Sequence, residues 1–427
     1  MNLSNKKILY TLIIIFCLTF LFFFLPVTEP IRIYTLVSTS TSVVYLLICW
    51  FIFKSELTTK DVLIFTGLAV IVRLIFINFF PVGSDDIYRY MWDGKIQFNG
   101  INPYIYTPND PKLSFLHSNI LPAKVNFPDM KTIYFPLSQW LFYVGYLLSG
   151  ESIWGYKLLL FITELITIYS MYILLEQSKI ETKYLLFYVL CPLPIIQFAI
   201  DAHLDGLGFP LLLLSFFFYL KERKIVAAIL LGLSLSIKPV GLVFIPILFL
   251  REKGIANKLK VSIIPLLTFF VQFIPYIFKA NPFESFIIYT ENWTFNGFVF
   301  DILNFFFQDN QRTRFICGLL LLISLIPLYF SKKSIPDKIY YSALFMMIFS
   351  PVVHPWYIAW IAVLLPLTQK WSGIFYTALG SLTVFTVLNY QLNGIWKEYW
   401  TALFIEYLPV IILLYFELAK RKKLTTI

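Results

Sequence analysis

Two adjacent carboxylates, Asp85 and Asp86, stand in the stretch Gly83–Tyr104 (GSDDIYRYMWDGKIQFNGINPY), which directly follows an apolar segment. If a short helix begins at Asp86, one of its faces carries the residues at i, i+3, i+4 and i+7, which are Asp86, Arg89, Tyr90 and Asp93. A carboxylate held in this way can take a proton from a hydroxyl group, and a nearby guanidinium can bind an anion. The alternative interpretation is a solvated loop in which Asp85 or Asp86 pairs with Arg89 and caps a helix.

The rest of the chain is strongly apolar. Of its 427 residues, 59% are hydrophobic and only 14% are charged, whereas about a quarter of the residues in a soluble domain are charged. This composition predicts an all-α polytopic membrane protein. The net charge of +10 does not indicate nucleic-acid binding, because the basic residues cluster in short connections, where they set orientation and contact anionic membrane lipid.

Apolar runs of about 20 residues, the length that crosses a bilayer, predict the helices. The candidates are Ile8–Pro26, Ile33–Phe53, Asp61–Phe80, Ser152–Leu175, Tyr184–Ile200, Leu204–Leu220, Val261–Phe278, Phe315–Phe330, Tyr340–Phe349, His354–Leu367, Ile374–Leu388 and Thr401–Leu418. Tyr134–Leu148 is short, and Ile225–Leu250 is interrupted at Lys238–Pro239, so both are interpreted as re-entrant, interfacial or broken segments. The prediction is a single domain over residues 1–427 with about 12–14 transmembrane helices.

Lys and Arg clusters between the apolar runs, including the tail Lys420–Lys423, predict that both termini are cytoplasmic. The stretches Pro81–Ile133 and Lys279–Arg314, the connection Asp201–Asp205 and the turn at His354 then lie outside. The first of these becomes a large extracytoplasmic loop that bears short amphipathic helices and the candidate site.

A carboxylate site on that face is expected to act on a substrate carried by the membrane. Nucleotide sugars and ATP are not supplied on the outer side of a bacterial inner membrane, so a sugar tethered to a lipid phosphate is the expected donor, with no cofactor required. Its phosphate needs cations, and the candidates are Arg89, Arg73, Lys238 and His354. In the alternative interpretation, Arg73 snorkels or pairs with an Asp, and Lys238 reaches the cytoplasmic interface.

Other polar and aromatic side chains could complete the site. Four aromatic residues either stack on a sugar or belong to the interfacial belts, namely Trp293, Tyr104, Trp356 and Tyr357. His203 and Asp205 are two residues apart, a poor spacing for metal ligands on a helix, so we expect them to form hydrogen bonds. No metal site is predicted, and assistance by a divalent cation is left open.

The motif DDIYRYMWDG…GINPY, placed after an early span, resembles the first outer loop of GT-C glycosyltransferases. It is most similar to the polyprenol-phosphate-mannose-dependent mannosyltransferases of bacteria. Weaker motifs follow in the expected order: YFP at Tyr134–Pro136, HLD at His203–Asp205, then Lys238–Pro239, WTFN at Trp293–Asn296 and HPWY at His354–Tyr357. The ordered set extends from about Asp61 to Leu367.

The resemblance implies a GT-C-like fold and the transfer of a hexose, expected to be mannose, from a polyprenyl-phosphate donor to an extracytoplasmic glycan or glycolipid acceptor. The early acid of that family corresponds to Asp86, with Asp85 second, as a base or as the group that orients the acceptor hydroxyl. A single displacement would invert the anomeric carbon. The sequence lacks the soluble C-terminal domain of some relatives, which leaves the acceptor open.

Three other kinds of protein were weighed. A transporter or lipid flippase would show pseudo-symmetric halves with polar residues near mid-membrane, and neither is evident. An O-antigen polymerase or ligase would place its large outer loop late, whereas Pro81–Ile133 comes early. A membrane scaffold gives no reason for the Asp85/Asp86 pair.

Overall fold

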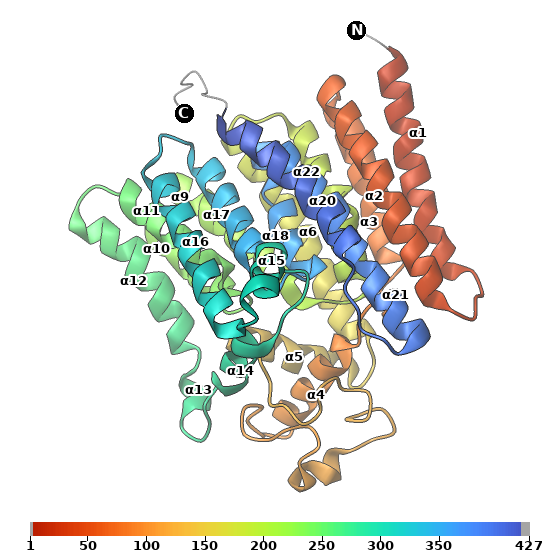
Figure 1. The fold of residues 1–427 in the computed structure, drawn as a ribbon, viewed down its shortest axis with the longest axis vertical. Helices are drawn as coiled ribbons and strands as arrows, with labels where there is room; N and C mark the ends of the chain where they lie inside the picture. Colours follow the sequence, from red (N-terminus) through yellow and green to blue (C-terminus); the bar gives the residue numbers. More distant parts are fainter. Residues whose placement is uncertain (1–2, 420–427) are drawn as a thin grey trace. The chain divides into compact units, whose positions relative to one another are not determined.

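A computed structural model describes residues 3–419, which form helices joined by turns and loops (Figure 1). Within this range the only strand-like pairing is an isolated parallel bridge between Phe295 and Val352. The predicted all-α class is therefore confirmed. The basic tail Lys420–Lys423 lies outside the described residues.

Contacts divide the chain into two compact units, each assembled from segments that are distant in sequence. Unit 1 comprises Met1–Arg73, Met171–Ile196 and Thr294–Ile427, and unit 2 comprises Leu74–Ser170 and Gln197–Trp293. The boundary falls inside α6 (Trp154–Gln177) and the π-helical turn η4 (Ile195–Ile200), and it separates the last residue of α3 (Thr59–Leu74) from the rest of that helix.

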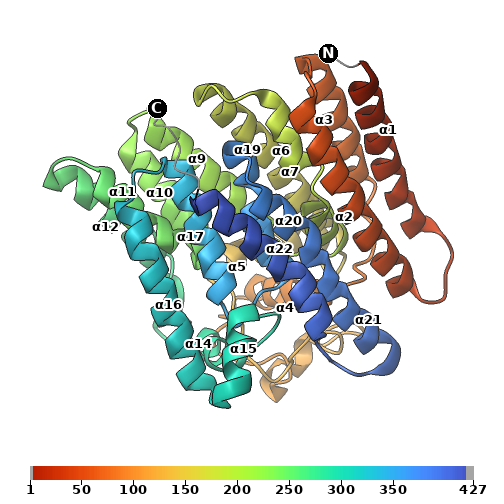
Figure 2. The ribbon, with the colours of Figure 1, turned by 45° about the horizontal axis from the view of Figure 1, so that its top comes forward.

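Unit 1 holds the first three helices and the C-terminal third of the chain. Its elements are α1 (Leu3–Thr19), η1 (Phe20–Phe24), α2 (Pro30–Lys54), α3 (Thr59–Leu74), η3 (Thr182–Leu185), α7 (Leu186–Val189), α8 (Pro192–Pro194), α15 (Phe298–Phe307), α16 (Asn310–Phe330), α17 (Ile335–Phe349), α18 (Pro355–Ala362), α19 (Leu365–Thr368), α20 (Trp371–Leu379), η7 (Gly380–Thr383), α21 (Val384–Asn393) and α22 (Trp400–Ala419). Within this unit, the start of α1 and the end of α22 lie at the same end of the helices (Figures 1 and 2).

Unit 2 holds the long polar stretch and the middle of the chain. Its elements are α4 (Asp86–Phe98), η2 (Pro111–Leu116), α5 (Pro136–Ser149), η5 (Leu204–Gly208), α9 (Phe209–Leu220), α10 (Lys224–Leu235), η6 (Pro239–Phe244), α11 (Ile245–Arg251), α12 (Ile255–Val271), α13 (Ile274–Ile277) and α14 (Glu284–Asn292). Helix α10 packs between α9 and α12, and α4 packs against α5.

The helices bear out the multi-pass prediction. Among residues 3–419, six are long and apolar enough to cross a membrane, or seven if the pair Thr182–Val189 and Pro192–Ile200, bent by 49°, is one span. The other predicted spans fall on shorter helices or on runs of consecutive helices, so the count of 12–14 stays a prediction. Helix α10 ends at Leu235 and η6 begins at Pro239, which confirms the predicted break at Lys238.

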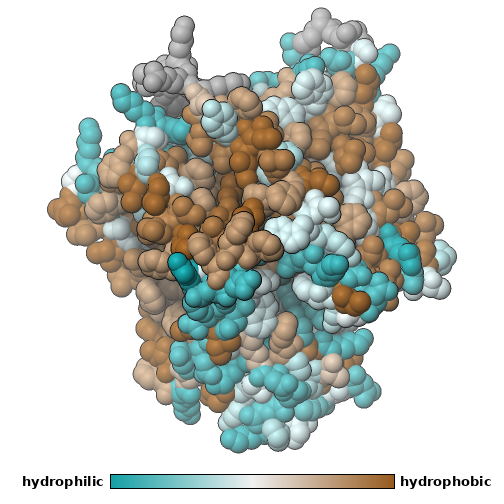
Figure 3. Space-filling view, viewed as in Figure 1, coloured by the Kyte–Doolittle hydropathy of each residue, from teal (hydrophilic) through white to brown (hydrophobic). Residues whose placement is uncertain are grey.

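Apolar side chains on the outside of the helices indicate contact with lipid. In α1, Leu9, Ile13 and Phe16 are buried at helical spacing, on the side that packs against α2, whereas Ile14 and Leu18 on the other side are 49% and 55% exposed. Helix α16 likewise exposes several large apolar residues. Figure 3 shows hydrophobic side chains gathered over α16 and hydrophilic ones over the segment between α4 and α5.

Candidate functional site

Helix α4 begins at Asp86, as the sequence predicts, and it is fixed against α5 by a close backbone approach. A Cβ atom on Gly94 would collide with the backbone carbonyl of Phe142, so only glycine permits this packing. One turn earlier in α4, Tyr90 stacks on the Phe142 ring with centroids 4.6 Å apart. The start of α4, and with it Asp86, is therefore held by α5.

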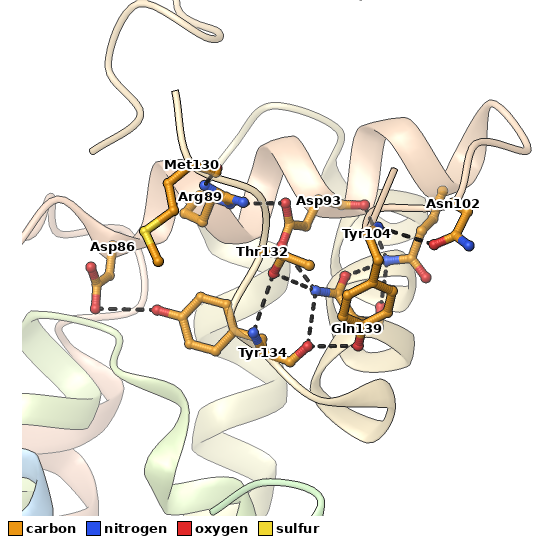
Figure 4. A network of polar contacts seen from close by, with 10 residues as sticks. Asp86, Arg89, Asp93, Asn102, Tyr104, Met130, Thr132, Tyr134 and Gln139 are labelled. Carbon is orange, nitrogen blue, oxygen red and sulfur yellow. Dashed lines mark hydrogen bonds and ion pairs between the residues drawn. The ribbon is translucent and has the colours of Figure 1, made fainter. Parts of the chain in front are cut away.

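Asp86 is contacted by three side chains from distant parts of unit 2. Its Oδ1 accepts a hydrogen bond of 2.6 Å from Asn126 Nδ2, and its Oδ2 lies 3.3 Å from His203 Nδ1. The Tyr134 hydroxyl donates to the same Oδ2 at 3.5 Å (Figure 4). The Asp86 side chain keeps an exposed fraction of 19%, whereas that of His203 is 1% exposed. The carboxylate is thus oriented from one side and reachable from the other.

Neighbouring groups differ in how readily they ionise. Asp85 is exposed at one edge, but the surrounding chain partly desolvates its carboxyl. This desolvation and the charge of Asp86 raise the pKa of the Asp85 carboxyl. Asp85 Oδ1 also accepts a hydrogen bond of 3.1 Å from Asn126. Burial and the charge of Asp86 raise the pKa of Tyr134 well above its usual value, so this phenol stays protonated and donates to Asp86.

A second ion pair belongs to the same cluster. Lys238 Nζ lies 3.1 Å from Asp205 Oδ1, and Lys238 is also close enough to Asp86 to interact with it electrostatically. Lys238 is thus paired within the site, and the side of the membrane on which it lies stays a prediction. We call Asp85, Asp86, His203, Asp205 and Lys238 the acid–base cluster.

Two residues that the sequence analysis missed hold the segments carrying this cluster. The ammonium of Lys157, a residue of α6 that is 2% exposed, donates to the carbonyls of Phe76 (3.2 Å), Ala199 (3.1 Å) and Ile200 (2.8 Å) and also to that of Phe79. A lysine inside an apolar run was the available signal, because such residues rarely occur without a role.

Asp201 is the second missed residue. Its Oδ1 accepts the backbone N–H groups of Val82 (3.0 Å) and Gly83 (2.9 Å), just before the Asp85/Asp86 pair. The next residue, Ala202, is completely buried and has a left-handed φ of 62°. This conformation costs about 1–2 kcal/mol for a residue with a Cβ, and such strain is often found at functional sites.

Arg89 and Asp93 form an internal network instead of facing Asp86. Arg89 Nε lies 3.0 Å from Asp93 Oδ1, and Arg89 Nη1 donates to the Met130 carbonyl at 2.9 Å (Figure 4). Asp93 Oδ2 accepts from Gln139 Nε2 at 2.9 Å. Arg89 is only 6% exposed. The alternative interpretation, in which Asp85 or Asp86 pairs with Arg89 and caps the helix, is therefore wrong: Arg89 pairs with Asp93, and Asp85 makes no side-chain cap bond to α4.

Several predicted substrate contacts have other partners. Tyr104 is 1% exposed, donates to the Tyr134 carbonyl at 2.7 Å and packs on Tyr276, so it is neither a free sugar platform nor a belt residue. Trp293 packs on Phe127 with ring centroids 5.1 Å apart. Arg73, in unit 1, donates to the carbonyls of Ala69 (3.1 Å) and Val189 (3.0 Å) and is 1% exposed, so its side chain is buried within the protein.

The HPWY motif is joined to the WTFN motif inside unit 1. The backbone N–H of Phe295 donates to the Pro351 carbonyl at 2.9 Å. The His354 ring is sandwiched between Phe295, at 4.7 Å, and Trp356, at 4.2 Å with an interplanar angle of 3°. Tyr357 meets the His354 ring edge-on. The predicted site residues therefore fall into two groups, one in each unit.

No group of three or more His, Cys, Asp or Glu side chains within residues 3–419 is arranged to hold a metal ion. In the acid–base cluster the candidate ligands contact one another or Lys238 instead.

The fold and the site define a polytopic helical membrane protein with a carboxylate cluster beside its membrane helices. Residues 19–252 match the family model described as alpha-(1->6)-mannopyranosyltransferase, N-terminal domain (MptA_B family). The match covers more than half of the chain, so the chain belongs to this family of membrane glycosyltransferases. The resemblance to GT-C mannosyltransferases is thereby confirmed.

Among solved structures, the chain is similar to ArnT from Cupriavidus metallidurans, whose crystal structure was determined with bound undecaprenyl phosphate. The identity is 16% and the TM-score 0.47, over 85% of this chain and 72% of that chain. No curated protein matches the sequence.

Proposed function

We propose that this protein transfers mannose from a polyprenyl-phosphate donor to a hydroxyl of an extracytoplasmic glycan or glycolipid, with Asp86 as the base. The family membership supports mannosyl transfer and an α-(1→6) linkage in the product. The donor class rests on the membrane setting, because an activated sugar on the outer side must be delivered on a lipid. The acceptor is the less defined partner.

The observation that carries the proposal is the set of contacts around Asp86. Asn126 and Tyr134 donate to it, and His203 lies beside it, so the carboxylate is fixed in orientation while an edge stays accessible. A general base needs this combination: a set direction and room for the hydroxyl within hydrogen-bond distance.

The reaction is a single displacement. The acceptor O–H gives its proton to an Asp86 oxygen while the hydroxyl oxygen bonds to the anomeric carbon of the sugar. The bond from that carbon to the phosphate oxygen breaks on the opposite face, and the polyprenyl phosphate leaves with the electron pair. A β-linked donor therefore gives an α-linked product.

Negative charge grows on the leaving phosphate and needs a cation. Lys238 is the best placed of the predicted cations, because it interacts with both Asp205 and Asp86 and its side chain is 23% exposed. Arg89 is engaged by Asp93 and Met130, so we assign it a positioning role. It holds α4 in the orientation that presents Asp86.

We further propose that the acid–base cluster lies on the extracytoplasmic face of a bacterial inner membrane, with both termini in the cytoplasm. Basic connections support this orientation, as does the placement of the two ends of unit 1 together (Figure 2). In a variant with its four native cysteines replaced, a membrane-impermeant thiol reagent should label Asn109→Cys in intact cells and spare Lys253→Cys. The reverse pattern would contradict the placement.

The decisive experiment is transfer in lipid nanodiscs with a synthetic β-mannosyl phosphoryl polyprenol and octyl α-mannoside. We expect a disaccharide whose NMR spectrum shows an α-(1→6) linkage, formed without added nucleotide. Product from GDP-mannose but not from the lipid donor would refute the donor class, and a β-linked product would refute the single displacement.

A further inference from the structure

A cavity of about 290 Å³ lies within unit 1, away in sequence from the Asp85/Asp86 pair. It is lined by α15, by η7 and α21, and by the connection that leads into α22. Its volume is near the lower end of the roughly 300–1,000 Å³ typical of small-molecule sites. A ligand of one or two rings fits this space better than a lipid chain.

Two acids and a threonine line this cavity. Asp301 and Glu398 line it, and neither forms an ion pair with a residue in the described range 3–419. Desolvation and the charge of Glu398 raise the pKa of Asp301 to about 7, in the ten-residue helix α15, which is too short to cross a membrane. Thr386 also lines the cavity and is 4% exposed.

The cavity wall is built around Asn296 of the WTFN motif. Its backbone N–H donates to Glu398 Oε2 at 2.5 Å, and its side-chain amide donates to both Glu406 oxygens at 3.1 and 3.2 Å. The Tyr407 hydroxyl donates to the Asn296 carbonyl at 2.9 Å. These bonds hold Asn296 at a left-handed φ of 54°. The wall is thus fixed before any ligand enters, which lowers the entropy cost of binding.

Aromatic rings complete the lining. Phe295, Tyr399 and Trp400 all border the cavity, and Trp400 is 46% exposed. Aromatic faces beside carboxylates and amides match the two sides of a sugar, which presents C–H groups to rings and hydroxyls to acceptors. Two carboxyl groups without a basic partner disfavour a phosphate or any other anion.

We propose that this cavity binds a neutral hexose unit of the acceptor glycan, which deepens the proposed function and rests on it. Asp301 and Glu398 accept hydrogen bonds from sugar hydroxyls, the Thr386 hydroxyl supplies a further polar contact, and Trp400 covers the apolar face of the ring. The cavity would thereby recognise a sugar unit of the acceptor, without contributing to the bond-making step.

Direct binding tests this independently of turnover. Full-length protein carrying Asp86→Asn is titrated calorimetrically with methyl α-D-mannopyranosyl-(1→6)-α-D-mannopyranoside. Asp301→Asn and Trp400→Ala are each expected to weaken binding about tenfold or more, and Thr386→Val about threefold. Two matched controls are expected to bind normally: Glu56→Gln, an exposed acid away from the cavity, and Trp50→Ala, an exposed tryptophan of α2 that does not line it.

The outcomes separate the two proposals. Unchanged affinity in all three cavity variants would overturn the cavity proposal, as would calcium or manganese binding that Asp301→Asn abolishes and the disaccharide does not displace. If the disaccharide binds as expected but the wild-type protein transfers no mannose in the nanodisc assay, the cavity stands as a saccharide site and the proposed reaction fails.

Discussion

The acid–base cluster in unit 2 and the cavity in unit 1 both bring carboxyl groups together, but the two regions differ in the partners that offset the negative charge of those groups. Around Asp86, every acid is met by a basic partner or a hydrogen-bond donor: His203 beside Asp86, and Lys238 beside Asp205. Around Asn296, the acids Asp301, Glu398 and Glu406 form no ion pair within residues 3–419, and an amide is the donor to two of them.

This difference indicates what each region can bind. A cluster that contains cations can hold an anionic group and stabilise charge that develops during a reaction. A cavity with acids and amides but no cation favours neutral hydroxyl groups. This contrast agrees with the two proposals above, which assign the lipid-linked donor to the acid–base cluster and a neutral sugar to the cavity.

The largest effect should come from Asp86→Asn, which keeps shape but removes the basic lone pair. We expect mannosyl transfer to fall by about 10²–10⁴-fold while the variant still folds and still binds the disaccharide. Asp129→Asn, an exposed acid of the same loop, is the matched control and should keep full activity. Loss in Asp85→Asn alone would move the base by one residue. Full activity in both would remove the catalytic role of the pair.

Replacing glycine by alanine should disturb helix packing in unit 2 but not in unit 1. Gly94→Ala forces α4 away from α5, and overpacking of this kind costs about 1–3 kcal/mol of stability. Because Asp86 begins α4, transfer should also fall. Gly318→Ala in α16 meets nothing within 4 Å and should leave stability equal or slightly raised, since alanine favours a helix. Equal melting temperatures for the two variants in detergent would show that the α4–α5 contact is not tight.

A double-mutant cycle on Asp205 and Lys238 measures how strongly the cluster is charge-balanced. Asp205→Asn and Lys238→Met each leave one charge without its partner, so the double variant should lose less stability than the sum, with a coupling of about 0.5–3 kcal/mol. The same cycle on Asn296 and Glu406, an amide–carboxyl contact, should give a smaller coupling. A larger value at Asn296 would reverse the contrast drawn between the regions.

The smallest effect is expected from the pH dependence of Asp85. Its pKa in the folded protein is raised above 3.8, so folding disfavours the charged form and stability is lost as pH rises from 3.8 through the folded pKa. Asp85→Asn lacks this loss. The melting temperature of the variant, relative to wild type, should rise as the pH increases from about 4 through the folded pKa of Asp85. The corresponding gain in stability is less than ~1 kcal/mol because Asp85 is exposed to solvent. A constant difference would contradict the raised pKa.

Local sequence patterns predicted where several helices of this protein lie, begin or break. The start of α4 at Asp86, the break after Leu235 and the positions of the apolar helices follow from periodicity, Pro and charge, which are local properties. The division of long apolar runs into short helices could not be predicted from these patterns. An apolar run of about 18 residues has the same composition whether it forms one helix or is broken by tertiary packing.

Partners could not be predicted in the same way. The sequence placed Arg89 near Asp86 on one face, but it could not show that Asp93, held by Gln139 from α5, would be the residue to pair with it. Tyr104 is an aromatic residue of the type that stacks on sugars, and only the tertiary structure shows that Tyr276 packs against it. Such contacts depend on which distant segments meet, and one sequence does not contain that information locally.

The lysine at the start of α6 has a consequence for biogenesis. Lys157 binds carbonyls of the segment before Asp85 and of the segment before His203, which are made at very different times during translation. The first segment can dock on α6 soon after that helix is inserted, but the Asp86–His203 contact must wait for His203, which lies 26 residues beyond the end of α6 at Gln177. A nascent chain released before that point would contain the entire Asp85/Asp86 motif and still lack an assembled site.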